Sequence, residues 1–135
     1  MKIVVDTDLL VSALAFQGGS PEAFYRLALE ERIDLVTSRR LLAELGRVLM
    51  EKLGWEAERA EEAIGQVVRL ADIVAPRKAL SEIEADPADN RVLEAAPEGG
   101  VDAIVSGDRH LLVLGSWRGI DIQSPAAFIA TNRTR

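Results

Sequence analysis

The stretch IVVDTDLLVSAL, residues 3–14, decides the fold class. Its first residues, Ile3–Val5, are β-branched, and so short an apolar run is typical of a buried strand. Asp6 follows this run directly, and Asp8 stands just before an apolar run with helical periodicity. The stretch therefore predicts a strand that leads at once into a helix. It also raises the question of whether the two acids cap that helix or hold a cation.

Four further short apolar runs are predicted to be strands, at residues 34–36, 72–74, 102–105 and 120–122. Helical patterns separate them, at residues 20–31, 38–53, 56–71 and from 86 onward. Strands that alternate with helices predict an α/β fold, with a short, mostly parallel central sheet of about five strands flanked by helices. We find no internal repeat and expect a single domain over residues 1–135, with 77–84 as the longest polar connection and a candidate flap.

The composition, 48% hydrophobic and 28% charged residues, is typical of a soluble globular domain. No apolar run approaches the roughly 20 residues that span a bilayer, and the first residues lack a secretory signal pattern. The absence of cysteine excludes disulfides and thiolate zinc sites, so we expect a cytoplasmic protein without a membrane partner. The net charge of −6 argues against non-specific coating of nucleic acid, but not against an enzyme that meets phosphates locally.

Asp6 and Asp8 receive different interpretations. Asp8 precedes the helical run, and helix capping accounts for it. Asp6 continues directly from a buried strand, and burying a carboxylate without a partner costs several kcal/mol. We therefore expect a compensating partner for Asp6.

A second acid is predicted at the same edge of the sheet. Asp108 follows the strand at 102–105 after Ser106 and Gly107, and parallel sheets place ligands at the carboxyl ends of their strands. Asp108 could equally cap a short helix that begins at Arg109. The single histidine, His110, is interpreted as incidental.

Two further candidates lie on predicted helices. Asp89 would stand at the third position of a helix that begins at Pro87, where the helix dipole favours an acid. Val92 and Leu93 follow it at helical spacing, so Asp89 shares the buried face, where a purely stabilising surface acid is not needed. Glu44 falls at the margin of the apolar stripe of its helix, and a solvent-exposed edge position is an equal alternative.

Four carboxylates that converge on one site repel one another, and divalent cations relieve this repulsion. Carboxylates without Cys or His suit Mg²⁺ or Mn²⁺ better than Zn²⁺. Such metals bind a phosphodiester and activate water, so the residues point to phosphodiester hydrolysis.

Five blocks of the sequence resemble the PIN-domain family, in particular a prokaryotic toxin group related to VapC: VVDTDLLVSAL, LVTSRRLLAELGRVL, DPADNRVLEAA, DAIVSGDRHLL and IDIQSPAAFI. They occur in the family's order and at roughly its spacing, over almost the whole chain. The resemblance implies a three-layer PIN-like fold and a metal-dependent ribonuclease. It maps the four acids of the family onto Asp6, Glu44, Asp89 and Asp108, the same four that the residue patterns indicate.

From the resemblance we expect hydrolysis of single-stranded RNA with one or two Mg²⁺ or Mn²⁺ ions, by the toxin of a toxin–antitoxin pair. Asp6, Asp89 and Asp108 would bind metal directly, and Glu44 would bind metal or orient the attacking water. The resemblance also implies a homodimer and a cognate antitoxin. Two positions depart from the family pattern, because Asp8 replaces the usual Asn and His110 stands where relatives often carry an acid.

Several polar residues are candidates for supporting roles. The candidates for hydrogen bonds to the metal ligands or for further metal contacts are Thr7, Asp8 and Ser106. Those for contacts with RNA phosphates are Arg39, Arg40, Arg109 and Arg118, although solvated surface charge explains each of them individually.

Three other kinds of protein share part of this pattern. A haloacid-dehalogenase-like phosphatase also ends its first strand in Asp-x-Asp, but it needs a late second acid at the position that Leu112 occupies here. A receiver domain needs a phosphoacceptor Asp on a third strand and a late Lys, and neither is evident. A PIN fold that serves only as a binding or dimerisation module would be expected to lack core acids, all four of which are present.

Overall fold

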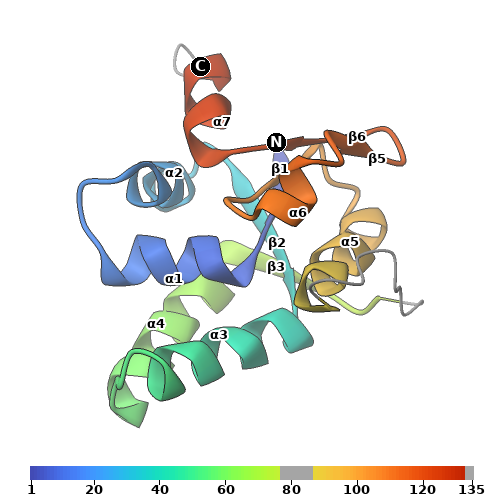
Figure 1. Cartoon of the computed structure of the whole chain (residues 1–135). Helices are drawn as coiled ribbons and strands as arrows, with labels where there is room; N and C mark the ends of the chain where they lie inside the picture. The colour runs from blue at the N-terminus through green and yellow to red at the C-terminus, as the bar shows by residue number, and fades with distance from the viewer. Residues whose placement is uncertain (77–86, 133–135) are drawn as a thin grey trace.

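Six strands form the single central sheet of the computed structural model, which describes residues 1–76 and 87–132 (Figure 1). In sheet order they are β3 (Ala71–Val74), β2 (Asp34–Ser38), β1 (Lys2–Val5), β4 (Ala103–Val105), β6 (Ile120–Gln123) and β5 (Ser116–Trp117). All neighbours are parallel except β5 and β6. The mostly parallel sheet and its five predicted strands are confirmed. The two-residue strand β5 was not predicted, because a hairpin partner this short has no apolar run of its own.

The chain reverses its direction across the sheet at β1. It moves from β1 to β2 and β3 on one side, and then returns to β4 on the other side. The register pairs Val4 with Val36 of β2, and Val5 with Val105 of β4. In parallel α/β sheets, ligands bind outside the carboxyl ends of the strands at such a switch point. The carboxyl ends of β1 and β4 are therefore where the fold itself places a site.

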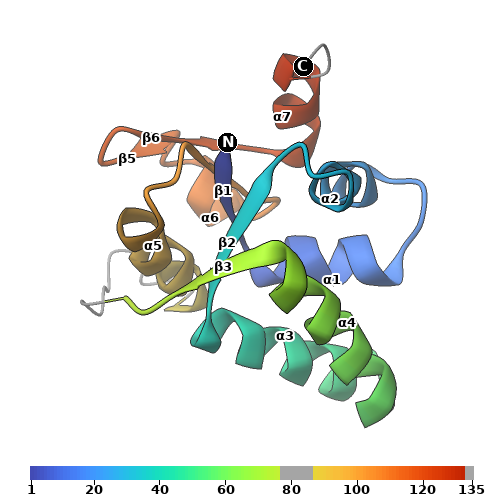
Figure 2. The ribbon, with the colours of Figure 1, turned by 180° about the vertical axis from the view of Figure 1, so that it is seen from behind.

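Helices cover both faces of the sheet (Figures 1 and 2). Around one core lie α1 (Thr7–Ala15), α2 (Ser20–Leu29), α3 (Arg39–Glu51), α4 (Ala57–Leu70) and α7 (Pro125–Asn132). Over the other core lie α5 (Pro87–Gly99) and α6 (Arg109–Leu112). Successive side chains of β1 point to opposite faces of the sheet, so Ile3 and Val5 lie in the first core and Val4 lies in the second. The three-layer α/β arrangement is thus as predicted.

No helix in the described part of the chain is long and apolar enough to cross a membrane.

The predicted helices agree with the observed ones to within a few residues. Ser38 caps α3 by accepting a hydrogen bond from the Leu41 N–H at 3.3 Å, and α5 begins at Pro87, as predicted. The helix α2 begins at residue 20, as predicted, and its cap residue is Gly19, which has no side chain to accept a capping hydrogen bond. The final helix α7 was not predicted. Residue 86, at which the fourth helical pattern starts, and the predicted flap at 77–84 lie outside the described residues.

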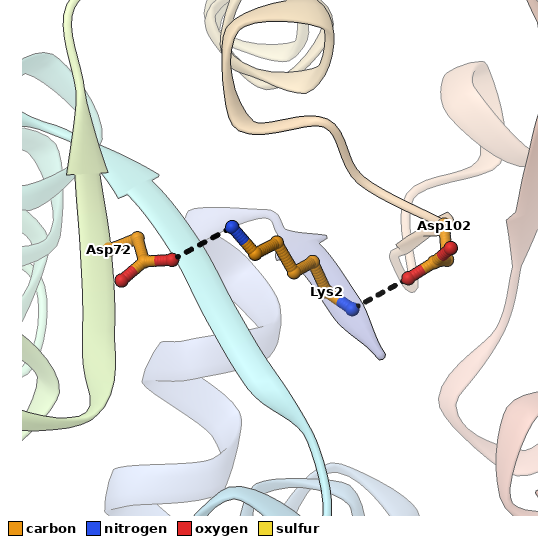
Figure 3. Close-up of polar contacts among 3 residues, drawn as sticks. All are labelled: Lys2, Asp72 and Asp102. Atoms are coloured by element: carbon orange, nitrogen blue, oxygen red, sulfur yellow. Dashed lines mark hydrogen bonds and ion pairs between the residues drawn. The ribbon is translucent and has the colours of Figure 1, made fainter.

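Lys2 ties the start of β1 to two other strands (Figure 3). Its backbone N–H donates to Asp102 Oδ2 at 2.8 Å, and the Asp102 N–H donates back to the Lys2 carbonyl, also at 2.8 Å. Its side chain reaches across β2, where Nζ lies 3.4 Å from Asp72 Oδ2 on β3. Both side chains of this ion pair are largely exposed, so it contributes little to stability.

Phe128 anchors α7 to the rest of the molecule. It is 1% exposed and meets the fully buried Phe24 of α2 edge to face, with ring centroids 5.4 Å apart. We expect Phe128→Ala to lower the free energy of unfolding by about 3–5 kcal/mol, because it leaves a cavity at this contact. Urea unfolding measures the change. Asp72→Asn, which breaks the exposed ion pair, is the control and should cost less than about 1 kcal/mol. Similar losses in the two variants would contradict this assignment of the packing.

Candidate active site

Asp6 is a buried carboxylate at the end of the central strand, and it is 3% exposed. Its Oδ1 accepts a hydrogen bond from the Leu9 N–H at 2.9 Å, so Asp6 is the N-cap of α1. Its Oδ2 accepts a hydrogen bond from the Ser106 hydroxyl. The prediction that Asp8 caps this helix is wrong, since Asp8 lies exposed in the first turn. The compensation expected for Asp6 comes from these two hydrogen bonds.

The surroundings of Asp6 raise its pKa from 3.8 to about 6. Burial is the largest cause, because it disfavours the charged form. The hydrogen bonds from Ser106 and Leu9 lower the pKa, whereas the charges of Asp8 and Asp108 raise it. Asp6 is therefore still mostly ionised at neutral pH, but in an environment that a nearby cation would relieve.

Ser106 links the ends of β1 and β4. It is fully buried, and its backbone N–H donates to the carbonyl of Gln123 on β6 at 3.0 Å. Its hydroxyl donates to Asp6 and accepts from the Asp108 N–H at 2.9 Å. One side chain thus fixes the carboxylate of Asp6 relative to the backbone of Asp108.

Asp108 caps the short helix α6 and also lies close enough to influence Asp6. Its Oδ1 accepts a hydrogen bond from the His110 N–H at 2.7 Å, and the side chain is half-buried. Its charge is one of the causes that raise the pKa of Asp6. The sequence allows either a capping role or a position near Asp6 for Asp108, and the structure combines the two.

Thr7 is a candidate for a supporting hydrogen bond or for a further metal contact. Its hydroxyl oxygen is buried and has no hydrogen-bond partner among the described residues, and the same holds for Thr37 at the end of β2. Ser106, which was proposed for the same role, makes two such bonds.

Glu44 and Asp89 lie on helices that meet near this edge of the sheet. Glu44 is half-buried on α3, and α5, which carries Asp89 in its first turn, contacts α3, β1 and β2. The side chain of Asp89 is not among those that the structure describes. Within the described part of the chain, no three acidic or histidine side chains are grouped closely enough to hold a metal ion. The structure thus brings Asp6 and Asp108 together. Glu44 and Asp89 are placed near them only through the positions of α3 and α5.

The four arginines proposed for phosphate contacts are all exposed. Arg39 and Arg40 form the first turn of α3, and Arg109 begins α6 beside Asp108. The guanidinium of Arg118 instead stacks over the Trp117 ring, 4.4 Å from its centroid.

Sequence reasoning missed a buried polar group on α5. Arg91 Nη2 lies 2.8 Å from Glu94 Oε2, with Glu94 5% and the neighbouring Asn90 2% exposed. The spacing of three residues between Arg91 and Glu94 indicates a helical ion pair. Its burial was not predictable, because it depends on what packs over the helix.

Comparisons with known proteins agree with this architecture. Residues 2–110 match the family model described as "PIN domain", a family whose members are generally nucleases. A search of curated protein sequences gives no match. Among solved structures, PAE2754 from Pyrobaculum aerophilum aligns with a TM-score of 0.65 at 14% identity, over 100% of this chain and 91% of that one. VapBC2 from Rickettsia felis, bound to a DNA fragment from their promoter, aligns with a TM-score of 0.65 at 14% identity, over 92% of this chain and 98% of that one. At this identity the structural matches show the fold.

The raised pKa of Asp6 predicts a pH-dependent effect of Asp6→Asn. The carboxyl group of Asp6 binds its proton more tightly in the folded state than in the unfolded chain. The stabilisation of the folded state by this proton is complete below about pH 4 and is lost as the pH rises through about 6. Asn still caps a helix. In the presence of a chelator, we expect Asp6→Asn to be more stable than wild type above about pH 6, by up to about 3 kcal/mol, and to lose this advantage near pH 4.

Urea unfolding at several pH values measures this difference. The exposed Asp121→Asn is the control and should show no comparable pH dependence. A stability difference between Asp6→Asn and wild type that does not change with pH would contradict the assignment.

Proposed function

The chain belongs to the PIN-domain family, and we propose that it is a metal-dependent endoribonuclease that hydrolyses phosphodiester bonds of single-stranded RNA. The observation that carries the proposal is the buried carboxylate of Asp6 at the switch point, joined through Ser106 to Asp108. A group that only stabilised the fold would not need a charge whose pKa is raised by burial and by two neighbouring acids.

The donor set fits a hard divalent cation, Mg²⁺ or Mn²⁺. The described atoms that face one another here are carboxylate and hydroxyl oxygens, and the chain has no cysteine. We assign Asp6, Asp89 and Asp108 as ligands of one or two ions, and Glu44 as a ligand or as the residue that orients the attacking water. A bound ion would lower the pKa of water and offset the charge that develops on the phosphate oxygens.

The protein residues then have distinct tasks. Asp6 and Asp108 present negative oxygens from two adjacent strand ends, and Ser106 keeps them in register with each other. Arg109 stands next to Asp108 at the surface and is the nearest candidate in sequence for contact with an RNA phosphate. The exposed Asp8 adds a further carboxylate that acts on Asp6 through its charge.

The cellular role we propose is that of a cytoplasmic toxin, active as a homodimer and held in check by a cognate antitoxin. The likeness in fold to VapBC2, which is bound to a fragment of promoter DNA in its crystal structure, supports this role. Expression of the wild-type chain should arrest growth of a bacterial host and change its RNA, whereas expression of Asp6→Asn should not.

A PIN fold that binds RNA or another partner without catalysis is the alternative. It predicts RNA binding that neither needs metal nor leads to cleavage. The family match leaves the phosphatase alternative without support.

Cleavage of a labelled single-stranded RNA tests the proposed reaction. We expect cleavage with Mg²⁺ or Mn²⁺, loss of cleavage with a chelator, and at least about 100-fold slower cleavage in Asp6→Asn, Asp89→Asn and Asp108→Asn, because each removes a charge that holds the cation. Asp121→Asn, an exposed acid on β6, should retain activity. Cleavage that survives both chelation and Asp6→Asn would contradict the mechanism, and metal-independent RNA binding without cleavage would favour the binding module.

Ser106→Ala tests whether Ser106 positions the ligands. We expect the affinity for Mn²⁺ to fall about 10–100-fold, because the hydroxyl that fixes Asp6 relative to Asp108 is lost. Calorimetric titration measures the affinity, and the exposed Ser116→Ala is the matched control. Unchanged affinity in Ser106→Ala would show that the hydrogen bonds serve the fold alone.

A further inference from the structure

A cavity of about 470 Å³ opens at the carboxyl ends of β2 and β3. We call it the β2–β3 cavity, and its lining consists of Ser38–Arg40 and residues 73–76. Its volume is in the range of small-ligand sites. Strand β2 leads directly into α3 here, and β3 runs beside it as the edge of the sheet (Figure 2).

The charge of the β2–β3 cavity is positive, although the protein as a whole is acidic. Arg39 and Arg40 supply two exposed guanidinium groups, and no acid is among the lining residues that the structure describes. Neither guanidinium forms an ion pair with a residue that the structure describes. Both belong to the first turn of α3, where the helix dipole also favours an anion.

A second large cavity has a lining of mixed charge. It lies along α4, has a volume of about 540 Å³, and is lined by Arg59 and Arg69 together with Glu61 and Glu62. Its mixed charge has no preference for an anion. Of these two cavities, the β2–β3 cavity is the one that lies at the carboxyl edge of the sheet and has no acid among its described lining residues.

The β2–β3 cavity lies next to the candidate active site. The register pairs Val4 with Val36, and continuing it by two residues places Asp6 beside Ser38 on the neighbouring strand. Adjacent strands are about 4.8 Å apart, so the cavity begins one strand away from the carboxylate of Asp6. A polymer whose phosphate lies at Asp6 would extend naturally toward Arg39 and Arg40.

Residues 73–76 form the apolar part of the lining. Ile73 is 45% exposed on the edge strand, and Val74, Ala75 and Pro76 continue from it. Exposed apolar side chains next to two cations match a ligand that has both a flat apolar part and an anionic part. A nucleotide has this chemistry, with a base that packs on apolar surface and a phosphate that pairs with arginine.

We infer that the β2–β3 cavity is a subsite for one nucleotide of single-stranded RNA, adjacent to the phosphate that is cleaved. The base lies against Ile73 and Pro76, and Arg39 and Arg40 hold the flanking phosphates. This inference rests on the proposed function for its position relative to the scissile bond. Binding in the subsite itself requires neither metal nor catalysis.

The arginines are tested by RNA binding in the presence of a chelator, with fluorescence anisotropy of a short labelled single-stranded RNA. We expect the double variant Arg39→Ala/Arg40→Ala to bind about tenfold more weakly. The slope of log affinity against log salt should fall by about 1.4, because two phosphate contacts are lost. The control is Arg26→Ala/Arg47→Ala, which removes the same charge from exposed positions on α2 and on the far half of α3.

The apolar part is tested by Ile73→Asp. A carboxylate at this position should repel the phosphates and displace the base, and we expect binding to weaken about tenfold. Val68→Asp is the matched control, because Val68 is a 40% exposed apolar residue on α4, outside the cavity lining. Thermal unfolding of each variant verifies that it is folded.

The outcomes separate the subsite from the proposed nuclease. Weaker binding in the cavity variants but not in their controls supports the subsite, whether or not the protein cleaves RNA once metal is added. Equal binding in the cavity variants and controls, or no binding of RNA by wild type in the chelator, overturns the subsite even if cleavage with metal is observed. Binding through the subsite without any cleavage would overturn the proposed nuclease and leave the subsite in place.

Discussion

The contact between Asp6 and Ser106 is the interaction on which the rest of the site depends. It joins the ends of the two strands at which the sheet reverses direction, and both side chains are almost completely buried. A carboxylate in this position must be compensated, and the α1 N-terminus and the Ser106 hydroxyl provide that compensation. The fold thus places the carboxylate of Asp6 at the switch point of the sheet, outside the carboxyl ends of the strands, where parallel α/β sheets bind ligands.

Three neighbouring strand ends share one design. Each leads into a helix whose N-cap is a polar residue at or near the strand end: Ser38 for α3, Asp6 for α1 and Asp108 for α6. Capping satisfies backbone N–H groups, and the same oxygens are thereby held at a common edge. The arrangement explains how residues that stabilise the fold also form a site. It also places the acidic end of β1 beside the cationic β2–β3 cavity, and the proposed RNA substrate would contact both.

Much of this could be predicted from sequence, because the decisive signals are local. The β-branched run before Asp6, the Ser38 cap and the alternation of strands with helices indicate the sheet and its carboxyl edge. The capping role of Asp6 was not predicted, because Asp8, two residues later, fits the same sequence pattern for a helix cap. Helix α7, strand β5 and the buried Arg91–Glu94 pair depend on tertiary packing, which no local pattern encodes. The cavity at residues 73–76 depends on sheet order in the same way.

We propose that the buried carboxylate of Asp6 binds a divalent cation. Calorimetric titration of Mn²⁺ into wild type, Asp6→Asn and Asp121→Asn tests it most directly, because the readout requires no substrate. The account predicts saturable binding to wild type and Asp121→Asn, and loss of that binding in Asp6→Asn. Equal binding to all three proteins would contradict it.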